Sequence, residues 1–182
     1  MDFDRALGIL LDGFAARHIR AAAIGGFALG ALGAPRATVD LDFLVHKDDL
    51  GELDALMTGA GYVRRFVSEN VSQYVSADAA LGNVDFIHAF RSISLAMLER
   101  SSEVPVQGGK RRVKVLAPED VIGLKVQAIA NNPSRAQKDL ADIQALAEAR
   151  AGRLDWARLE EYFDLFKMEK EFAELRGRFP DA

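Results

Sequence analysis

The stretch AIGGFALGALGAPRATVDLDFLV, residues 23–45, decides the fold, because it joins two apolar runs through a pair of glycines. The first run, 20–24, predicts a short strand that ends at Gly25-Gly26. Residues 27–32 have the composition of a short helix, and residues 37–45 predict a second strand. The chain is therefore expected to begin its sheet as strand, glycine turn, short helix and strand.

Two aspartates lie inside the second of these strands. Because side chains alternate across a strand, the apolar Leu41 and Phe43 are expected on a buried face. The residues of the buried face would be Ala37, Val39, Leu41, Phe43 and Val45, and those of the polar face Arg36, Thr38, Asp40 and Asp42. Like charges this close repel unless a cation lies between them, and a divalent cation with oxygen ligands would relieve the repulsion. The plain alternative is an edge strand with a polar outer face.

A third carboxylate and the glycine pair extend this pattern. Asp85 shares a polar face with Asn83 on the predicted strand 82–87. Gly25-Gly26 allows close approach to the backbone, and a helix that begins there presents free N–H groups to an anion. A tight turn between strand and helix would explain the glycines equally well. Taken together, the parts describe a site for a nucleoside triphosphate, with amides for the phosphates and carboxylates for Mg²⁺.

These residues resemble the polymerase-β-type nucleotidyltransferases. The matching parts are Ile24-Gly25-Gly26, then Asp40-Leu41-Asp42, then Asp85 on a later strand. The run 36–43 is similar to the minimal nucleotidyltransferases and to abortive-infection toxins of the AbiEii type, as are the stretches 117–125 and 135–142. The resemblance covers roughly residues 20–165.

The resemblance implies a role for each matching residue. Asp40, Asp42 and Asp85 would be the catalytic and metal-binding residues, holding two Mg²⁺ or Mn²⁺ ions, with Asp85 accepting the proton of the acceptor hydroxyl. Gly25 and Gly26 would cradle the β- and γ-phosphates of an NTP, with ATP as the expected nucleotide. The other residues assigned to nucleotide binding are Arg36, Thr38, Lys125, Lys138 and Asp139.

The later residues have alternatives of their own. Lys125 stands in the apolar stripe of a predicted helix, where a lysine either extends its ammonium to solvent or points into a cleft at an anion. Asp139 and Asp142 lie near the start of a helix expected over 134–149, with Ser134 as its cap. The helix dipole alone would favour acids there, as would a role in holding the nucleotide or the acceptor.

Composition excludes several classes of protein. The 182 residues carry a net charge of -4, which argues against a surface that coats nucleic acid. Because cysteine is absent, disulfides, zinc–thiolate sites and a cysteine nucleophile are excluded. The N-terminus does not resemble a signal peptide, and no apolar run approaches the roughly 20 residues of a membrane span. We therefore expect a cytoplasmic protein with no membrane partner.

The order of predicted elements indicates an α/β (α+β) fold. A small mixed sheet is expected in a catalytic core over 1–116, followed by a C-terminal helical part over 117–182 that packs on it. Its helices are expected over 118–131, 134–149 and 155–176.

The resulting hypothesis is a nucleotidyltransferase that moves an NMP group from an NTP to a hydroxyl acceptor by a two-Mg²⁺ mechanism and releases pyrophosphate. The acceptor would be a small molecule, a tRNA end or a protein. The alternative is a relative without catalysis that binds a nucleotide or a partner, for example as one component of a toxin–antitoxin pair with a cognate antitoxin.

Overall fold

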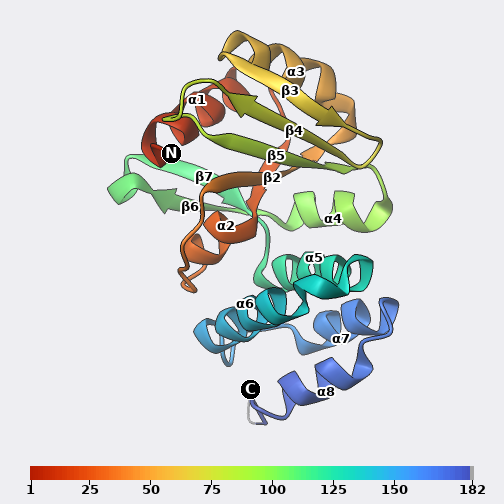
Figure 1. Ribbon diagram of the computed structural model, residues 1–182. Helices are drawn as coiled ribbons and strands as arrows, with labels where there is room; N and C mark the ends of the chain where they lie inside the picture. The colour runs from red at the N-terminus through yellow and green to blue at the C-terminus, as the bar shows by residue number, and fades with distance from the viewer. Residues whose placement is uncertain (181–182) are drawn as a thin grey trace. The chain divides into compact units, whose positions relative to one another are not determined.

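The structure is a computed structural model that describes residues 1–180 (Figure 1). Its first part alternates helices and strands, and its last part is helical. The helices are α1 (Phe3–Ala16), α2 (Gly25–Ala31), α3 (Leu50–Gly59), α4 (Ser92–Arg100), α5 (Pro118–Asn131), α6 (Ala136–Ala149), α7 (Trp156–Leu165) and α8 (Glu169–Arg176). The strands are β1 (Ala21–Ile24), β2 (Asp40–His46), β3 (Tyr62–Val67), β4 (Val71–Ser76), β5 (Asn83–Ala89), β6 (Ser102–Val106) and β7 (Arg111–Val115).

Within the described residues, the strands form one mixed sheet of seven, in the order β3-β4-β5-β2-β1-β7-β6. The pairs β2–β5 and β1–β7 are parallel, and the other neighbours are antiparallel. The expected small mixed sheet with helices is therefore confirmed. The parallel pair β2–β5 lies at the centre of the sheet, and this pair carries the three aspartates that the sequence singled out.

An aromatic cluster fixes one face of the sheet. The Phe14 ring on α1 meets the Phe43 ring on β2 edge-on at 5.3 Å, and Phe43 stacks on Phe86 of β5 at 5.8 Å. Tyr74 of β4 completes the cluster against Phe86. Helices α1 and α3 lie on this side of the sheet, while α2 and α4 lie on the other (Figure 1). The face opposite the aromatic cluster is the one left for polar groups on β2 and β5.

The strand with the two aspartates is shorter than predicted. It begins at Asp40, so the alternation expected from residue 37 fails over its first part, and Val39 is 74% exposed. From Leu41 onward the prediction holds, because Leu41, Phe43 and Val45 are fully buried. The two aspartates therefore lie at the start of the strand, as its first and third residues.

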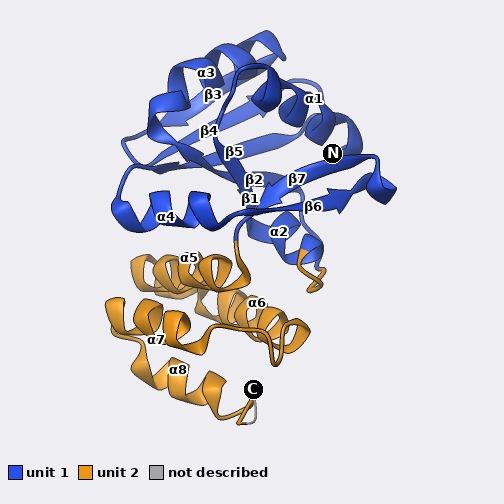
Figure 2. Cartoon of the chain, turned by 180° about the vertical axis from the view of Figure 1, so that it is seen from behind, with its two compact units in different colours: residues 1–31, 36–116 blue, residues 32–35, 117–182 orange. Residues whose placement is uncertain are grey.

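Contacts between residues divide the chain into two compact units (Figure 2). The first contains residues 1–31 and 36–116, and the second contains 32–35 and 117–182. In the second unit, α5 packs against α6 and α7, and α7 packs against α8. The helix expected over 155–176 is in fact α7 and α8, separated at Lys167, whose φ is +57°. None of the helices described is both long and apolar enough to span a membrane.

Candidate active site

The pairing of β2 with β5 places the three predicted aspartates on adjacent strands. These strands are parallel neighbours, and the register places Asp42 directly opposite Asp85 and Asp40 opposite Asn83. All three aspartates are half-buried, on the face opposite the aromatic cluster. The sequence prediction that Asp85 would lie beside Asp40 and Asp42 on an adjacent strand is what the register shows.

Asp85 has a neighbour that the sequence analysis missed. Gln73 on β4 stands opposite Asp85 in the sheet, and its Nε2 donates a hydrogen bond to Asp85 Oδ2 at 3.0 Å. Burial raises the pKa of Asp85; the Gln73 hydrogen bond acts against this rise, and the charge of Asp40 adds to it. The net result is a carboxylate that holds its proton more tightly than an ordinary aspartate, and therefore a stronger base once ionised.

The first glycine of the turn lies against Asp42. Gly25 has a φ of +63°, which disfavours any residue with a Cβ. A Cβ placed there would lie 2.7 Å from Asp42 Cγ and closer still to its Oδ2. A glycine is therefore required at this position both by the backbone conformation and by the carboxylate beside it. The helix α2 begins at Gly25 itself, two residues earlier than the sequence predicts.

The second glycine faces the segment that leads into β2. A Cβ at Gly26 would lie 2.8 Å from Thr38 Oγ1 and 3.0 Å from Arg36 Nη1. Thr38 Oγ1 donates to the carbonyl oxygen of Asp40 at 3.2 Å, and Arg36 Nη1 donates to that of Ala37 at 2.8 Å. The glycine turn is thus enclosed by Asp42 on one side and by Arg36 and Thr38 on the other.

A pocket of about 420 Å³ opens beside this turn, within the first unit. Gly26, Arg36 and Thr38 line one part of it. Its remaining walls are Phe3, Phe27, Gly30, Ala31, Val106 and Gln107. The sequence could not have assembled this pocket, because Phe3 and Gln107 are distant from the glycine turn along the chain and carry no recognisable pattern.

The three aspartates supply the kind of oxygen ligand that a hard cation takes, but within residues 1–180 no three His, Cys, Asp or Glu side chains are arranged as a cluster that could hold a metal ion. Carboxylate oxygens are the ligands that Mg²⁺ prefers. Burial and the charge of Asp40 both raise the pKa of Asp85, so the ionised form of this carboxylate is electrostatically penalised. A cation bound by Asp40, Asp42 and Asp85 would remove that electrostatic penalty.

Two of the predicted residues of the second unit, Lys125 and Asp139, belong to a buried ion cluster. Lys125 is only 8% exposed, and its Nζ donates to Asp139 Oδ1 at 3.0 Å and to Asp142 Oδ2 at 2.6 Å. Arg135 Nε donates to Asp139 Oδ2 at 2.7 Å. Lys138 is exposed on the same helix as the two aspartates. Of the two expected arrangements, Lys125 therefore adopts the one in which its ammonium points at an anion. The anions are carboxylates of the protein itself.

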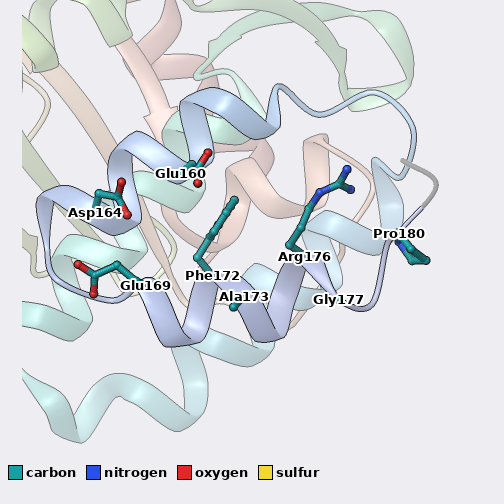
Figure 3. Close-up of a pocket in the computed structure, with 8 residues that line it drawn as sticks. All are labelled: Glu160, Asp164, Glu169, Phe172, Ala173, Arg176, Gly177 and Pro180. Carbon is teal, nitrogen blue, oxygen red and sulfur yellow. The ribbon is translucent and has the colours of Figure 1, made fainter.

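The second unit also has a hollow of its own, of about 710 Å³ (Figure 3). Carboxylates line it from both helices of the α7–α8 pair, with Glu160 and Asp164 on α7 and Glu169 on α8. Phe172 forms part of its wall, and its ring also contacts those of Trp156 and Phe163. None of the sequence-predicted site residues lines this hollow, so it is separate from the candidate site.

Comparisons with known proteins bear on this arrangement. A protein-family model described as "Uncharacterised nucleotidyltransferase" matches residues 3–176. Curated proteins give no significant match. The fold is similar to the solution structure of the antibiotic-resistance factor ANT(2'')-Ia, with a TM-score of 0.70 and 16% identity over 98% of this chain and 99% of that one.

Two further solved structures share the fold. A nucleotidyltransferase-like antigenic protein from Paracoccidioides brasiliensis gives a TM-score of 0.61 and 18% identity over 99% of this chain and 89% of that one. The lincosamide antibiotic adenylyltransferase LnuA gives a TM-score of 0.57 and 14% identity, over 80% of this chain and 96% of that one. At these identities the likeness concerns the fold.

Proposed function

The chain belongs to the nucleotidyltransferase family whose model matches residues 3–176, and from this premise we propose that it transfers an NMP group from an NTP to a hydroxyl acceptor. In the reaction, the acceptor oxygen forms a bond to the α-phosphorus, the bond from that phosphorus to the bridging oxygen breaks, and pyrophosphate leaves. The observation that carries the proposal is the position of Gly25 against Asp42, which itself stands opposite Asp85. This contact supports the proposal, because a turn that would bind phosphates lies against one of the carboxylates that would hold the cations.

Each residue of this constellation has a role in the proposal. The backbone of Gly25-Gly26 would hold the β- and γ-phosphates, with Arg36 and Thr38 beside it to complete the phosphate contacts. Asp85 would accept the proton of the acceptor hydroxyl, a role that its raised pKa supports. Gln73 would orient Asp85 through its hydrogen bond.

Asp40, Asp42 and Asp85 would hold the divalent cations, with two Mg²⁺ as the expected pair and Mn²⁺ as the substitute. When bound, such cations neutralise charge on the triphosphate and make the acceptor oxygen easier to deprotonate. The contribution of the chain itself is to fix the three carboxylates on two adjacent strands, opposite a turn that only glycine can form.

The acceptor is proposed to be a small molecule that carries a hydroxyl group. ANT(2'')-Ia has been crystallised with adenylyl-2''-tobramycin, and LnuA with lincomycin, so this fold accommodates small hydroxylated acceptors in those proteins. ATP is the expected donor on the same ground. A tRNA end, a protein hydroxyl and a cognate antitoxin are the other partners that the assay below would reveal.

The experiment that tests this function follows the label of the nucleotide. The protein is incubated with Mg²⁺, a cell extract and each NTP labelled at the α-phosphorus, and the extract is then separated into small molecules, RNA and protein. We expect label to move from one α-labelled NTP into the small-molecule fraction, with release of pyrophosphate and no transfer from γ-labelled NTP.

Matched variants assign the transfer to the site. Asp42→Asn is expected to abolish labelling, whereas Asp48→Asn, at a residue exposed in the same unit, is expected to retain it. Transfer from γ-labelled NTP would identify a kinase instead. Nucleotide binding with no transfer from any NTP would favour the relative without catalysis.

A further inference from the structure

The pocket beside Gly26 has a composition that the phosphates of a nucleotide do not need. Two aromatic rings, Phe3 and Phe27, and the aliphatic Val106 contribute to its walls, and all its lining residues belong to the first unit. A phosphate-binding surface requires amides and cations, whereas rings and aliphatic groups bind the faces of a flat apolar ligand. The apolar walls of the pocket therefore suit a part of the ligand other than its phosphates.

We propose that this pocket holds the base of the nucleotide, an inference that rests on the proposed nucleotidyl transfer. Gly26, Arg36 and Thr38 line the pocket and also enclose the turn assigned to the phosphates. One ligand could therefore occupy both places only if a polyanionic part is connected to a flat ring part. A nucleoside triphosphate has that structure.

The polar groups of the pocket suit the edge of a base. Gln107 carries an amide that has both a donor and an acceptor, and it stands among the walls together with the Thr38 hydroxyl. Gln107 Nε2 donates to the carbonyl oxygen of Asp4 at 2.9 Å, which ties the β6–β7 connection to the start of α1. The backbone of Gln107 is left-handed, with a φ of +54°. The hydrogen bond to Asp4 positions this amide, as a group that distinguishes bases requires.

The volume is also appropriate. Pockets that bind small ligands measure about 300–1,000 Å³ and are lined mostly by apolar groups with a few polar ones. The volume of about 420 Å³ falls in this range. Gly30 on α2 faces open space, because a Cβ built there meets no atom within 4 Å. A large side chain at residue 30 would therefore enter the pocket without disturbing the packing of the helix.

The test separates the base from the phosphates. Calorimetry measures the Kd of Mg²⁺–ATP and of Mg²⁺–tripolyphosphate, which lacks base and sugar, for the wild type and for Gly30→Phe. We expect Gly30→Phe to weaken ATP binding by about tenfold or more, because the base loses its stacking surface, and to leave tripolyphosphate binding unchanged. Gly51→Phe is the matched control, since Gly51 is also an exposed helical glycine with open space around it, and it should change neither affinity.

Other outcomes overturn the inference. The inference is contradicted if Gly30→Phe binds ATP with wild-type affinity, or if this variant loses ATP and tripolyphosphate binding equally. It is also contradicted if the wild type binds tripolyphosphate as tightly as ATP. Unchanged ATP binding with a raised KM for the acceptor would reassign the pocket to the acceptor. Failure of the proposed function is distinguishable, because it appears in the wild type as absence of pyrophosphate release while nucleotide binding remains measurable.

A second pair of variants covers the case in which Gly30→Phe does not fold. Phe27→Ala removes one half-buried ring of the pocket and is expected to weaken ATP binding by about tenfold with tripolyphosphate unaffected. Gln107→Asn keeps a residue that tolerates the left-handed backbone but shortens the amide. We expect it to reduce the difference in affinity between ATP and the other three NTPs. Unchanged affinities in both variants contradict the inference.

Discussion

Asp85 illustrates how a single carboxylate is adjusted by its neighbours. It is half-buried, it accepts a hydrogen bond from Gln73, and it lies near the charge of Asp40. Burial and Asp40 both raise the pKa of Asp85, and the Gln73 hydrogen bond lowers it. The first two effects outweigh the third, so the site keeps a carboxylate that is ready to take a proton. Two predictions follow from this balance at the level of the residue.

Replacing Asp85 by asparagine should remove the base without harming the fold. We expect Asp85→Asn to lower kcat by about 10²–10⁴-fold. Because the folded-state pKa of Asp85 is raised, its contribution to stability is present at low pH and is lost as pH rises through that pKa. At neutral pH the variant should therefore melt at the wild-type temperature or above it. Strong destabilisation would instead identify Asp85 as a structural acceptor for Gln73.

Removing the hydrogen-bond donor should shift the pH dependence of the reaction. Gln73→Leu deletes the one interaction that lowers the pKa of Asp85, so the pKa should rise further. The acid limb of the kcat/KM profile is then expected to move to higher pH, because the base ionises later. Gln144→Leu, at a glutamine whose side chain donates to Glu148 on α6, serves as the control and should leave the profile in place. A profile that stays unmoved in Gln73→Leu would remove Asp85 from the role of base.

At the level of the element, the join between α5 and α6 depends on buried charge. Lys125 on α5 is bound by Asp139 and Asp142 on α6, and Asp139 also accepts from Arg135. Burial alone would raise the pKa of Asp139, but the hydrogen bonds and charges of Arg135 and Lys125 outweigh it and lower the pKa. The cluster therefore stabilises the helical unit above the unfolded-state pKa of Asp139, and this stability is lost as pH falls through the lowered value.

Breaking the cluster at its centre should be costly. Lys125→Met removes the cation that Asp139 and Asp142 share, while Arg135 still pairs with Asp139, and we expect this to lower the free energy of unfolding by about 3–5 kcal/mol in urea titrations. Lys138→Met, on the exposed face of α6, should change it by about 0.5 kcal/mol or less. If Lys125→Met kept wild-type stability and lost affinity for ATP, the triphosphate role expected from the resemblance would gain direct support.

The elements also show what the sequence could and could not predict. The buried face of β2 was predictable from Leu41 onward, because Leu41, Phe43 and Val45 follow the period of the strand, although Leu44 on the other face is buried as well. Helix α4 was not predicted, since Met97 is its one fully buried residue and no apolar stripe marks it. Ser134 does not cap α6 as expected; it lies in a short 3₁₀ turn, Pro133–Arg135, that Asn132 caps.

The site divides in the same way. The placement of Asp40, Asp42 and Asp85 on neighbouring strands and the turn at the glycine pair were predictable, because a strand, a turn and the face on which a strand residue lies can each be inferred from a few neighbouring residues. Gln73 was not, since its position opposite Asp85 depends on which strands become neighbours and in what register. Phe3 and Gln107 were also not predictable, because only the folded chain brings α1 and the β6–β7 connection to the glycine turn.

For the whole molecule, binding of the substrate should appear as added stability. A ligand that binds only the folded state at 100 times its Kd stabilises it by about 2.7 kcal/mol. We expect Mg²⁺ with ATP to raise Tm more than either component alone, because under the proposed function the carboxylates and the phosphates would share the cation. Asp42→Asn should reduce this shift in scanning calorimetry. An equal shift in the variant would place the cation elsewhere than at Asp42.

The segment Leu32–Pro35 limits how the two units can be exchanged between related chains. It belongs to the unit of α5–α8 although it follows α2 directly, Leu32 and Ala34 are buried, and Arg150 Nε donates to the carbonyl oxygen of Leu32 at 2.9 Å. A single crossover after residue 116 would separate these four residues from the helices with which they pack. The two units therefore cannot be exchanged by a single crossover. A chimaera must exchange residues 32–35 together with helices α5–α8 to keep each unit intact.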